Sequence, residues 1–207
     1  MSLKRLFALM VCLGTLVAGA LAQRNEVSGT IGRVFVSSQA VQGANFFDPN
    51  IHFGNGLTFG GNYSRLIMTR GIFGIFGEVS GAYSPDMKLN LSQNLIPKSY
   101  QSYFVTPGLR VNIFSGDSVT PWVSLGGGYG YFKQSSDLVF GGPNPGKTST
   151  NTGVFQFGAG LDVWPWQRWG LRLEARDYYS GVPDLNVTTV RSRQHNIYVG
   201  GGVIRRF

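Results

Sequence analysis

The sequence predicts an all-β protein, an eight-stranded antiparallel up-and-down transmembrane β-barrel. Eight segments alternate apolar and polar residues, the links between them alternate short and long, and aromatic residues gather near the segment ends. Only 14% of the 207 residues are charged, whereas 14% are aromatic and 30 are glycine. This composition is unusual for a soluble enzyme and suits strands that face lipid on one side and crowd together on the other.

The N-terminus has the layout of a secretory signal peptide. Lys4 and Arg5 precede a long apolar run that ends in Ala20-Leu21-Ala22, which matches an A-x-A cleavage site. We therefore expect a signal peptide over residues 1–22, cleaved after about Ala22, and a barrel domain over residues 23–207. An uncleaved anchor is the alternative, because the apolar run is about as long as a short spanning helix.

The rest of the chain contains no cysteine and no second apolar segment long enough to be a spanning helix. The single cysteine, Cys12, lies in the signal segment, so we expect no disulfide, thiolate metal site or cysteine nucleophile in the mature chain. No second run of 18 apolar residues follows Ala22. A membrane location must then come from strands, and only a closed barrel satisfies every backbone polar group of a sheet in lipid.

Eight segments have the two-residue period of strands. The clearest runs from Gly170 to Tyr179, where Leu171, Leu173 and Ala175 alternate with charged residues. Each segment is long enough to cross a bilayer as a tilted strand. The predicted strands are 26–36, 55–67, 72–84, 100–114, 120–132, 153–164, 170–180 and 195–207.

The links and the aromatic residues orient these strands. Short turns over 68–71, 115–119 and 165–169 alternate with long polar links, which is the pattern of outer-membrane barrels with short periplasmic turns and long outer loops. Both termini then lie in the periplasm. Aromatic residues are expected in two interfacial bands: Phe114, Trp122, Trp164, Trp166, Trp169 and Phe207 near the short turns, and Tyr83, Tyr103, Tyr131, Phe155 and Tyr179 near the loops.

The chain ends in NIYVGGGVIRRF, a strand that closes on Phe207. In this ending and in its strand layout, the sequence resembles the small outer-membrane β-barrels of Gram-negative bacteria, the OmpA-like transmembrane domain family. The resemblance implies a location in the bacterial outer membrane. It also implies recognition of the last strand, through Phe207, by the barrel-assembly machinery. A soluble barrel of the lipocalin type is the alternative fold.

Apolar faces turned toward lipid leave the polar faces to fill the lumen. Three acidic residues and three arginines would then lie inside a barrel just wide enough for side chains, and opposite charges at that distance should pair. The predicted lumen charge network consists of Glu78, Arg110, Asp162, Arg172, Glu174 and Arg176, with Ser80, Ser102, Thr106, Asn112 and Gln156 beside it.

Three local features bear on strand register. The glycine runs 126–128 and 200–202 predict close packing or bending of strands. Pro107 interrupts the fourth strand, where a bulge would accommodate it. Arg33 shares a face with Ile31 and Phe35, so it lies above the bilayer or is turned inward by a bulge.

The sequence offers little for catalysis or cofactor binding. His52 and His195 lie in separate segments, and a nucleophilic site needs serine, histidine and a carboxylate within hydrogen-bond reach. His195 is followed by Asn196 and Ile197, not by the His-x-Ser arrangement that a resemblance to the lipid A deacylases would need. Ser136-Asp137 could approach His52 only across the loops. We expect no enzyme activity, metal or cofactor. The basic residues at both rims favour contact with outer-membrane lipids and lipopolysaccharide, and no basic stripe suggests nucleic acid.

Two functions fit these features of the sequence. The first is an integral outer-membrane protein with a structural or surface-interaction role, whose lumen is filled by the charge network and whose loops meet an unidentified ligand. The second is a narrow porin-like channel for ions or small solutes, in which the arginines exchange partners among Glu78 and Glu174. The fold does not choose between them.

Overall fold

The computed structural model describes residues 25–45, 48–115 and 118–207. The predicted signal peptide therefore lies outside the described residues. Within the described ranges, no helix is long and apolar enough to cross a membrane.

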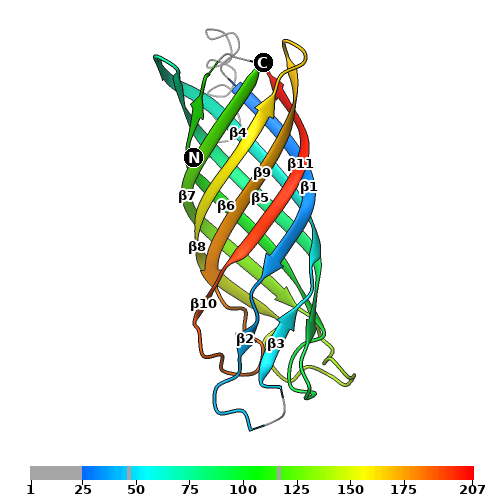
Figure 1. Cartoon of the computed structure of the whole chain (residues 1–207). Helices are drawn as coiled ribbons and strands as arrows, with labels where there is room; N and C mark the ends of the chain where they lie inside the picture. The colour runs from blue at the N-terminus through cyan, green and yellow to red at the C-terminus, as the bar shows by residue number, and fades with distance from the viewer. Residues whose placement is uncertain (1–24, 46–47, 116–117) are drawn as a thin grey trace, which may run out of the picture.

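Eight long strands form a closed ring of antiparallel pairs (Figure 1). The last strand pairs with the first, so the predicted eight-stranded up-and-down barrel is confirmed. The strands of the ring are β1 (Asn25–Val36), β4 (Gly56–Arg70), β5 (Phe73–Asn90), β6 (Ser99–Ile113), β7 (Val119–Gln134), β8 (Ser149–Val163), β9 (Trp169–Gly181) and β11 (Asn196–Arg206).

The two ends of the barrel differ as the link lengths predict. The C-terminus lies at the end with the short turns, and the longer connections gather at the opposite end (Figure 1). Three short strands that the sequence does not predict lie among these connections: β2 (Gln39–Ala40), β3 (Asn50–Phe53) and β10 (Arg193–Gln194). Strand β5 also runs six residues beyond its predicted end at Ser84, because a register shift between Ser84 and Met87 lets its pairing with β6 continue.

The wall of the barrel is apolar outside and polar inside. On β9, Leu171 and Leu173 keep 53% and 62% of their surface exposed, whereas Arg172 and Glu174 keep 1% and 4%. A soluble barrel would bury the leucines and expose the charges, because apolar surface is stabilised by leaving water. The inversion suits a wall that contacts lipid and excludes the lipocalin-type alternative.

The structure resolves the two uncertain registers without bulges. Pro107 lies opposite Val79 in the part of the β5–β6 ladder that keeps one register from Phe73 to Ser84, so the predicted bulge at Pro107 is wrong. Pro107 has no N–H group to donate. On its other side, the β6–β7 ladder has no pairs at Thr106 and Pro107 and resumes at Gly108 in the same register. Arg33 is exposed on the outer wall of a regular β1 near the loop end, so it is not turned inward.

The glycine runs allow strands to approach closely, as predicted. A Cβ atom at Gly128 would overlap the backbone of Val105, and one at Gly202 would overlap the backbone of Gly29. These contacts lie between neighbouring strands of the wall. Any larger residue would therefore force the strands apart.

The two aromatic bands are present, with two corrections. Phe114, Trp166 and Phe207 are exposed at the short-turn end, and tyrosines gather on the outer wall near the loops. Trp122 and Trp164, predicted in the first band, are instead 1% and 8% exposed and belong to the interior. Their positions on β7 and after β8 continue the inward-facing alternation, which outweighs the preference of tryptophan for the interface.

Candidate functional site in the filled lumen

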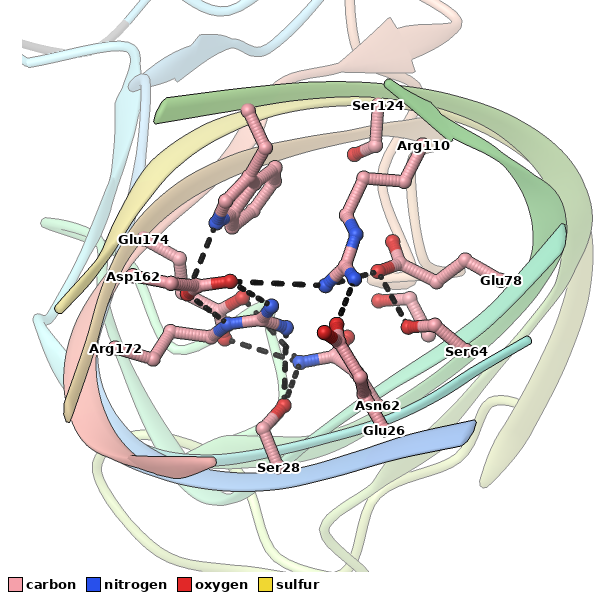
Figure 2. A network of polar contacts seen from close by, with 12 residues as sticks. Glu26, Ser28, Asn62, Ser64, Glu78, Arg110, Ser124, Asp162, Arg172 and Glu174 are labelled. Atoms are coloured by element: carbon pink, nitrogen blue, oxygen red, sulfur yellow. Dashed lines mark hydrogen bonds and ion pairs between the residues drawn. The ribbon is translucent and has the colours of Figure 1, made fainter. Parts of the chain in front are cut away.

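All six charged residues predicted to lie in the lumen point inward, and each is at most 4% exposed. Strand β9 supplies three of them, because Arg172, Glu174 and Arg176 occupy alternate positions on one face. The others come from β5, β6 and β8, and side chains from across the barrel meet at its centre (Figure 2).

The first group in this network is centred on Arg172 and Asp162, which are direct neighbours across β8 and β9. Arg172 donates two parallel hydrogen bonds to the Asp162 carboxylate, 2.8 and 2.7 Å long, and a third of 3.0 Å to Ser28. The indole N–H of Trp122 donates to the same carboxylate at 3.2 Å. The planar guanidinium fork and the carboxylate satisfy one another in a region without bulk water.

The second group is centred on Arg176. Its guanidinium joins Glu174 at 2.9 Å to Glu78 at 2.8 Å, so one cation holds carboxylates from two separate strands. Thr30 donates a further hydrogen bond of 2.7 Å to Glu174. These contacts cross-link β1, β5 and β9 through the lumen.

Arg110 is fully buried and less completely paired than the other arginines. It forms a close ion pair with Glu26, while Glu78 and Asp162 lie at 3.6 and 4.0 Å. Its guanidinium also lies 4.6 Å above the ring of Phe76. Among the described residues, its Nε and Nη1 atoms have no hydrogen-bond partner.

Two members of the network, Glu26 and Arg206, are not predicted from the sequence. Glu26 is 3% exposed and accepts a hydrogen bond of 2.8 Å from Arg206. The strict alternation Glu26-Val27-Ser28 could have predicted the position of Glu26, because it places Glu26 on the inward face with Ser28. Four carboxylates and four guanidinium groups of the described lumen therefore balance: Glu26, Glu78, Asp162 and Glu174 with Arg110, Arg172, Arg176 and Arg206.

A second, apolar layer fills the loop-side half of the lumen. Its rings pack edge-on and face-to-face, with Phe104 at 5.1 Å from Tyr178 and at 5.7 Å from Phe132. Ile51 of β3 joins it, so part of the first outer connection lies within the buried cluster. The sequence does not predict this layer, which comprises Val34, Ile51, Ala82, Met87, Leu89, Leu91, Ile96, Tyr100, Phe104, Phe132, Val154, Tyr178, Leu185 and Tyr198.

Two tyrosines connect the apolar layer to the charged layer. The Tyr178 hydroxyl lies 2.9 Å from Ser80, and the Tyr198 hydroxyl donates to Thr30 at 2.9 Å. Thr30 in turn donates to Glu174. The rings thus belong to the apolar layer while their hydroxyl groups complete the polar one.

Both histidines lie outside the lumen. His195 contacts Asp177 at 2.5 Å on the outer wall. His52 lies 2.9 Å from Asp48 and 3.2 Å from Ser38, an arrangement that the local sequence does not predict because the outer connection folds back on itself. The hydrogen bond with His52 lowers the pKa of Asp48 below its ordinary value. Among the described residues, no three His, Cys, Asp or Glu side chains are placed so that they could hold a metal ion together.

The comparisons with known proteins agree with this architecture. The family model of the outer membrane protein beta-barrel domain matches residues 8–202. No curated protein matches the chain significantly in sequence.

Three solved structures share the fold at low sequence identity. Neisserial surface protein A is 12% identical with a TM-score of 0.56, over 88% of this chain and 97% of that one. OprG from Pseudomonas aeruginosa is 12% identical with a TM-score of 0.55, over 91% and 98%. The N-terminal β-barrel domain of Pseudomonas aeruginosa OprF is 10% identical with a TM-score of 0.51, over 90% and 100%.

The inverted wall, the closed ring of eight strands and the family match lead to one conclusion. This chain belongs to the outer membrane protein beta-barrel domain family and is an integral protein of the bacterial outer membrane.

Proposed function

We propose that the protein is a closed barrel with a structural and surface-interaction role. One observation carries this proposal: two successive layers fill the lumen. A solute entering from the loop end meets Ile51, Met87 and Phe132, each 0% exposed, and then the charged layer around Arg110. The lumen stabilises the barrel, and the outer connections present the surface that meets other molecules.

Swelling of proteoliposomes in small sugars tests whether the lumen is closed. We expect liposomes that contain the inserted protein to swell no faster than empty ones. A double variant with Met87→Ala and Phe132→Ala, which removes part of the apolar layer, serves as the comparison. Swelling of the parent protein at rates that depend on sugar size would contradict the proposal.

A narrow channel is the second candidate, and the pairing of Arg110 favours it. Three carboxylates surround this guanidinium, yet two of its nitrogens lack hydrogen bonds among the described residues. An exchange of partners at Arg110 would loosen the charged layer. For ions to pass, the charged layer must loosen and the apolar layer must also move aside. The need for both changes favours the closed barrel over the channel.

We propose no catalytic role for the group formed by Ser38, His52 and Asp48. The side chains of His52 and Asp48 are 53% and 41% exposed, so water screens the pair. Nucleophilic catalysis gains most from a site that excludes water. A fluorophosphonate probe should label Ser38 no more than its neighbour Ser37, and labelling that His52→Ala abolishes would overturn this proposal.

The partners proposed for the ends of the barrel are lipids and the assembly machinery. Phe207 is 50% exposed, and its backbone exchanges hydrogen bonds of 3.0 and 3.1 Å with Asn25 at the seam between β1 and β11. An exposed ring on the closing strand supports a role as a recognition signal. The Phe207→Ala variant should be assembled into the outer membrane of cells in a lower amount than the parent protein, while it refolds in detergent equally well. Equal amounts of parent and variant in the membrane would refute that role.

A further inference from the structure

The outer wall carries an apolar groove across β4, β5 and β6. Its volume is about 370 Å³, and the outward-facing residues that line it are Phe59, Gly61, Gly81, Tyr83, Tyr103 and Val105. Gly61 and Gly81 are cross-strand neighbours, so two outward positions in a row have no side chain. A Cβ atom added at Gly61 would meet nothing within 4 Å.

An aromatic row borders this groove on the side of the outer loops. Phe59, Tyr83, Tyr103 and Tyr131 are consecutive cross-strand neighbours on β4 to β7. Tyr83 and Tyr103 stack at 4.5 Å, and Tyr131 lies 5.9 Å from Tyr103. Tyrosines of this kind mark the level of the lipid head groups, so the groove lies just inside the hydrocarbon of the outer leaflet.

Positive charge lies directly beyond the tyrosines. Lys133 is two residues from Tyr131 toward the loops, is paired with Gln101 and interacts electrostatically with Tyr83. Lys88 lies further along β5. Among the described residues no carboxylate forms an ion pair with either lysine within 4.0 Å, although Asp86 lines the same 500 Å³ cleft as Lys133.

An apolar groove, a row of tyrosines and unpaired lysines thus follow one another toward the outer surface. We propose that this face binds one molecule of lipid A, with an acyl chain in the groove over Gly61 and Gly81 and a phosphate at Lys133. A phosphorylated, acylated lipid of the outer leaflet matches both the apolar and the charged part. This inference deepens the proposed surface role by naming a partner, and it does not depend on whether the lumen conducts.

Native mass spectrometry of the refolded chain with bisphosphorylated hexa-acyl lipid A tests the site. Gly61→Leu fills the groove, and its matched control is Gly153→Leu, at an outer-wall position on β8 where a Cβ atom also meets nothing. Lys133→Gln removes the charge, and Lys147→Gln in an outer loop is its control. We expect Gly61→Leu and Lys133→Gln each to weaken lipid A binding by about fivefold, and both controls to bind like the parent.

Two further measurements identify the ligand chemistry. Lipid A without phosphates should bind the parent about as weakly as bisphosphorylated lipid A binds the Lys133→Gln variant. The Asp86→Asn variant should bind bisphosphorylated lipid A more tightly than the parent does, because a negative charge that competes for Lys133 is gone. Equal binding by Gly61→Leu and Gly153→Leu would overturn the proposal. Parent binding of phosphatidylethanolamine as tight as that of lipid A would overturn it too. A conducting lumen with lipid A binding intact would refute the closed barrel alone.

Discussion

Arg172 and Asp162 face each other across β9 and β8 and share two parallel hydrogen bonds inside the lumen. Each also has a second partner, Ser28 for the guanidinium and Trp122 for the carboxylate. A buried ion pair is stabilising only when its remaining hydrogen-bonding groups are satisfied, because both charges have lost their hydration. The ion pair of Arg172 and Asp162 meets this condition. The stability of the barrel should therefore fall when a hydrogen-bond partner of the buried charges is removed.

Glu174→Ala removes the carboxylate that Arg176, Thr30 and Asn62 share. We expect the free energy of unfolding to fall by about 3–5 kcal/mol, because the buried network then holds four arginines and only three carboxylates, although Arg176 keeps its pair with Glu78. Urea unfolding of the parent and variant in one detergent measures this, with the exposed loop variant Asp137→Ala as control. Equal unfolding midpoints for Glu174→Ala and the parent would show that the charge network contributes nothing.

Gly160→Ala tests how the ring of Trp122 packs inside the lumen. A Cβ atom at Gly160 would overlap the indole ring and the backbone carbonyl of Leu173, so the variant must displace Trp122, weakening its bond to Asp162, and push β8 away from β9. We expect a loss of about 1–3 kcal/mol and an altered near-ultraviolet circular dichroism spectrum. Gly153→Ala, whose Cβ atom meets nothing, should change stability by less than about 0.5 kcal/mol. Equal effects of the two substitutions would contradict this packing.

Leu173→Arg places a charge on the lipid-facing wall. Leu173 is 62% exposed on the outer face of β9, and a charge near the middle of such a wall costs about 2–4 kcal/mol. Unfolding from lipid vesicles measures the loss. Arg33→Leu should change stability far less, because Arg33 lies near the loop end of β1. A Leu173→Arg variant as stable as the parent would indicate that this face does not contact hydrocarbon.

His52→Ala tests the contact in the first outer connection. The hydrogen bond from His52 is the largest cause of the lowered pKa of Asp48, so the variant should raise that pKa toward its ordinary value. Because the pKa is lowered in the folded state, the ionised carboxylate stabilises the connection above the unfolded pKa. That contribution is lost as the pH falls through the lowered value. Carbon-13 chemical shifts of the Asp48 carboxyl measure the pKa, and an unchanged titration would refute the contact.

Much of the architecture follows from local sequence pattern. A strand's alternation fixes which face each residue takes, so Arg172, Glu174 and Arg176 were predictable as lumen residues from β9 alone. The same rule placed Glu78 and Arg110 inside. It would also have assigned Glu26, whose neighbours alternate strictly. Side-chain direction is therefore readable wherever strand register is regular.

Other features depend on contacts between distant segments. The apolar layer needs Ile51 of β3 to meet residues of β5, β6 and β7, and no local pattern encodes that meeting. The pairing of Ser38, Asp48 and His52 likewise depends on how one connection folds. The prediction for Trp122 was wrong because it followed the interfacial preference of the ring. The alternation along β7 places Trp122 inside, where Asp162 accepts its indole N–H.

Single-channel conductance of the refolded, demonstrably inserted protein in a planar bilayer tests the closed lumen most directly. With Arg110 held beside Glu26 and with Met87 and Phe132 fully buried, we predict no conductance steps at low or high salt. Small reproducible steps whose size changes in Arg110→Ala or Glu174→Ala would contradict the closed barrel and identify a channel through the charge network.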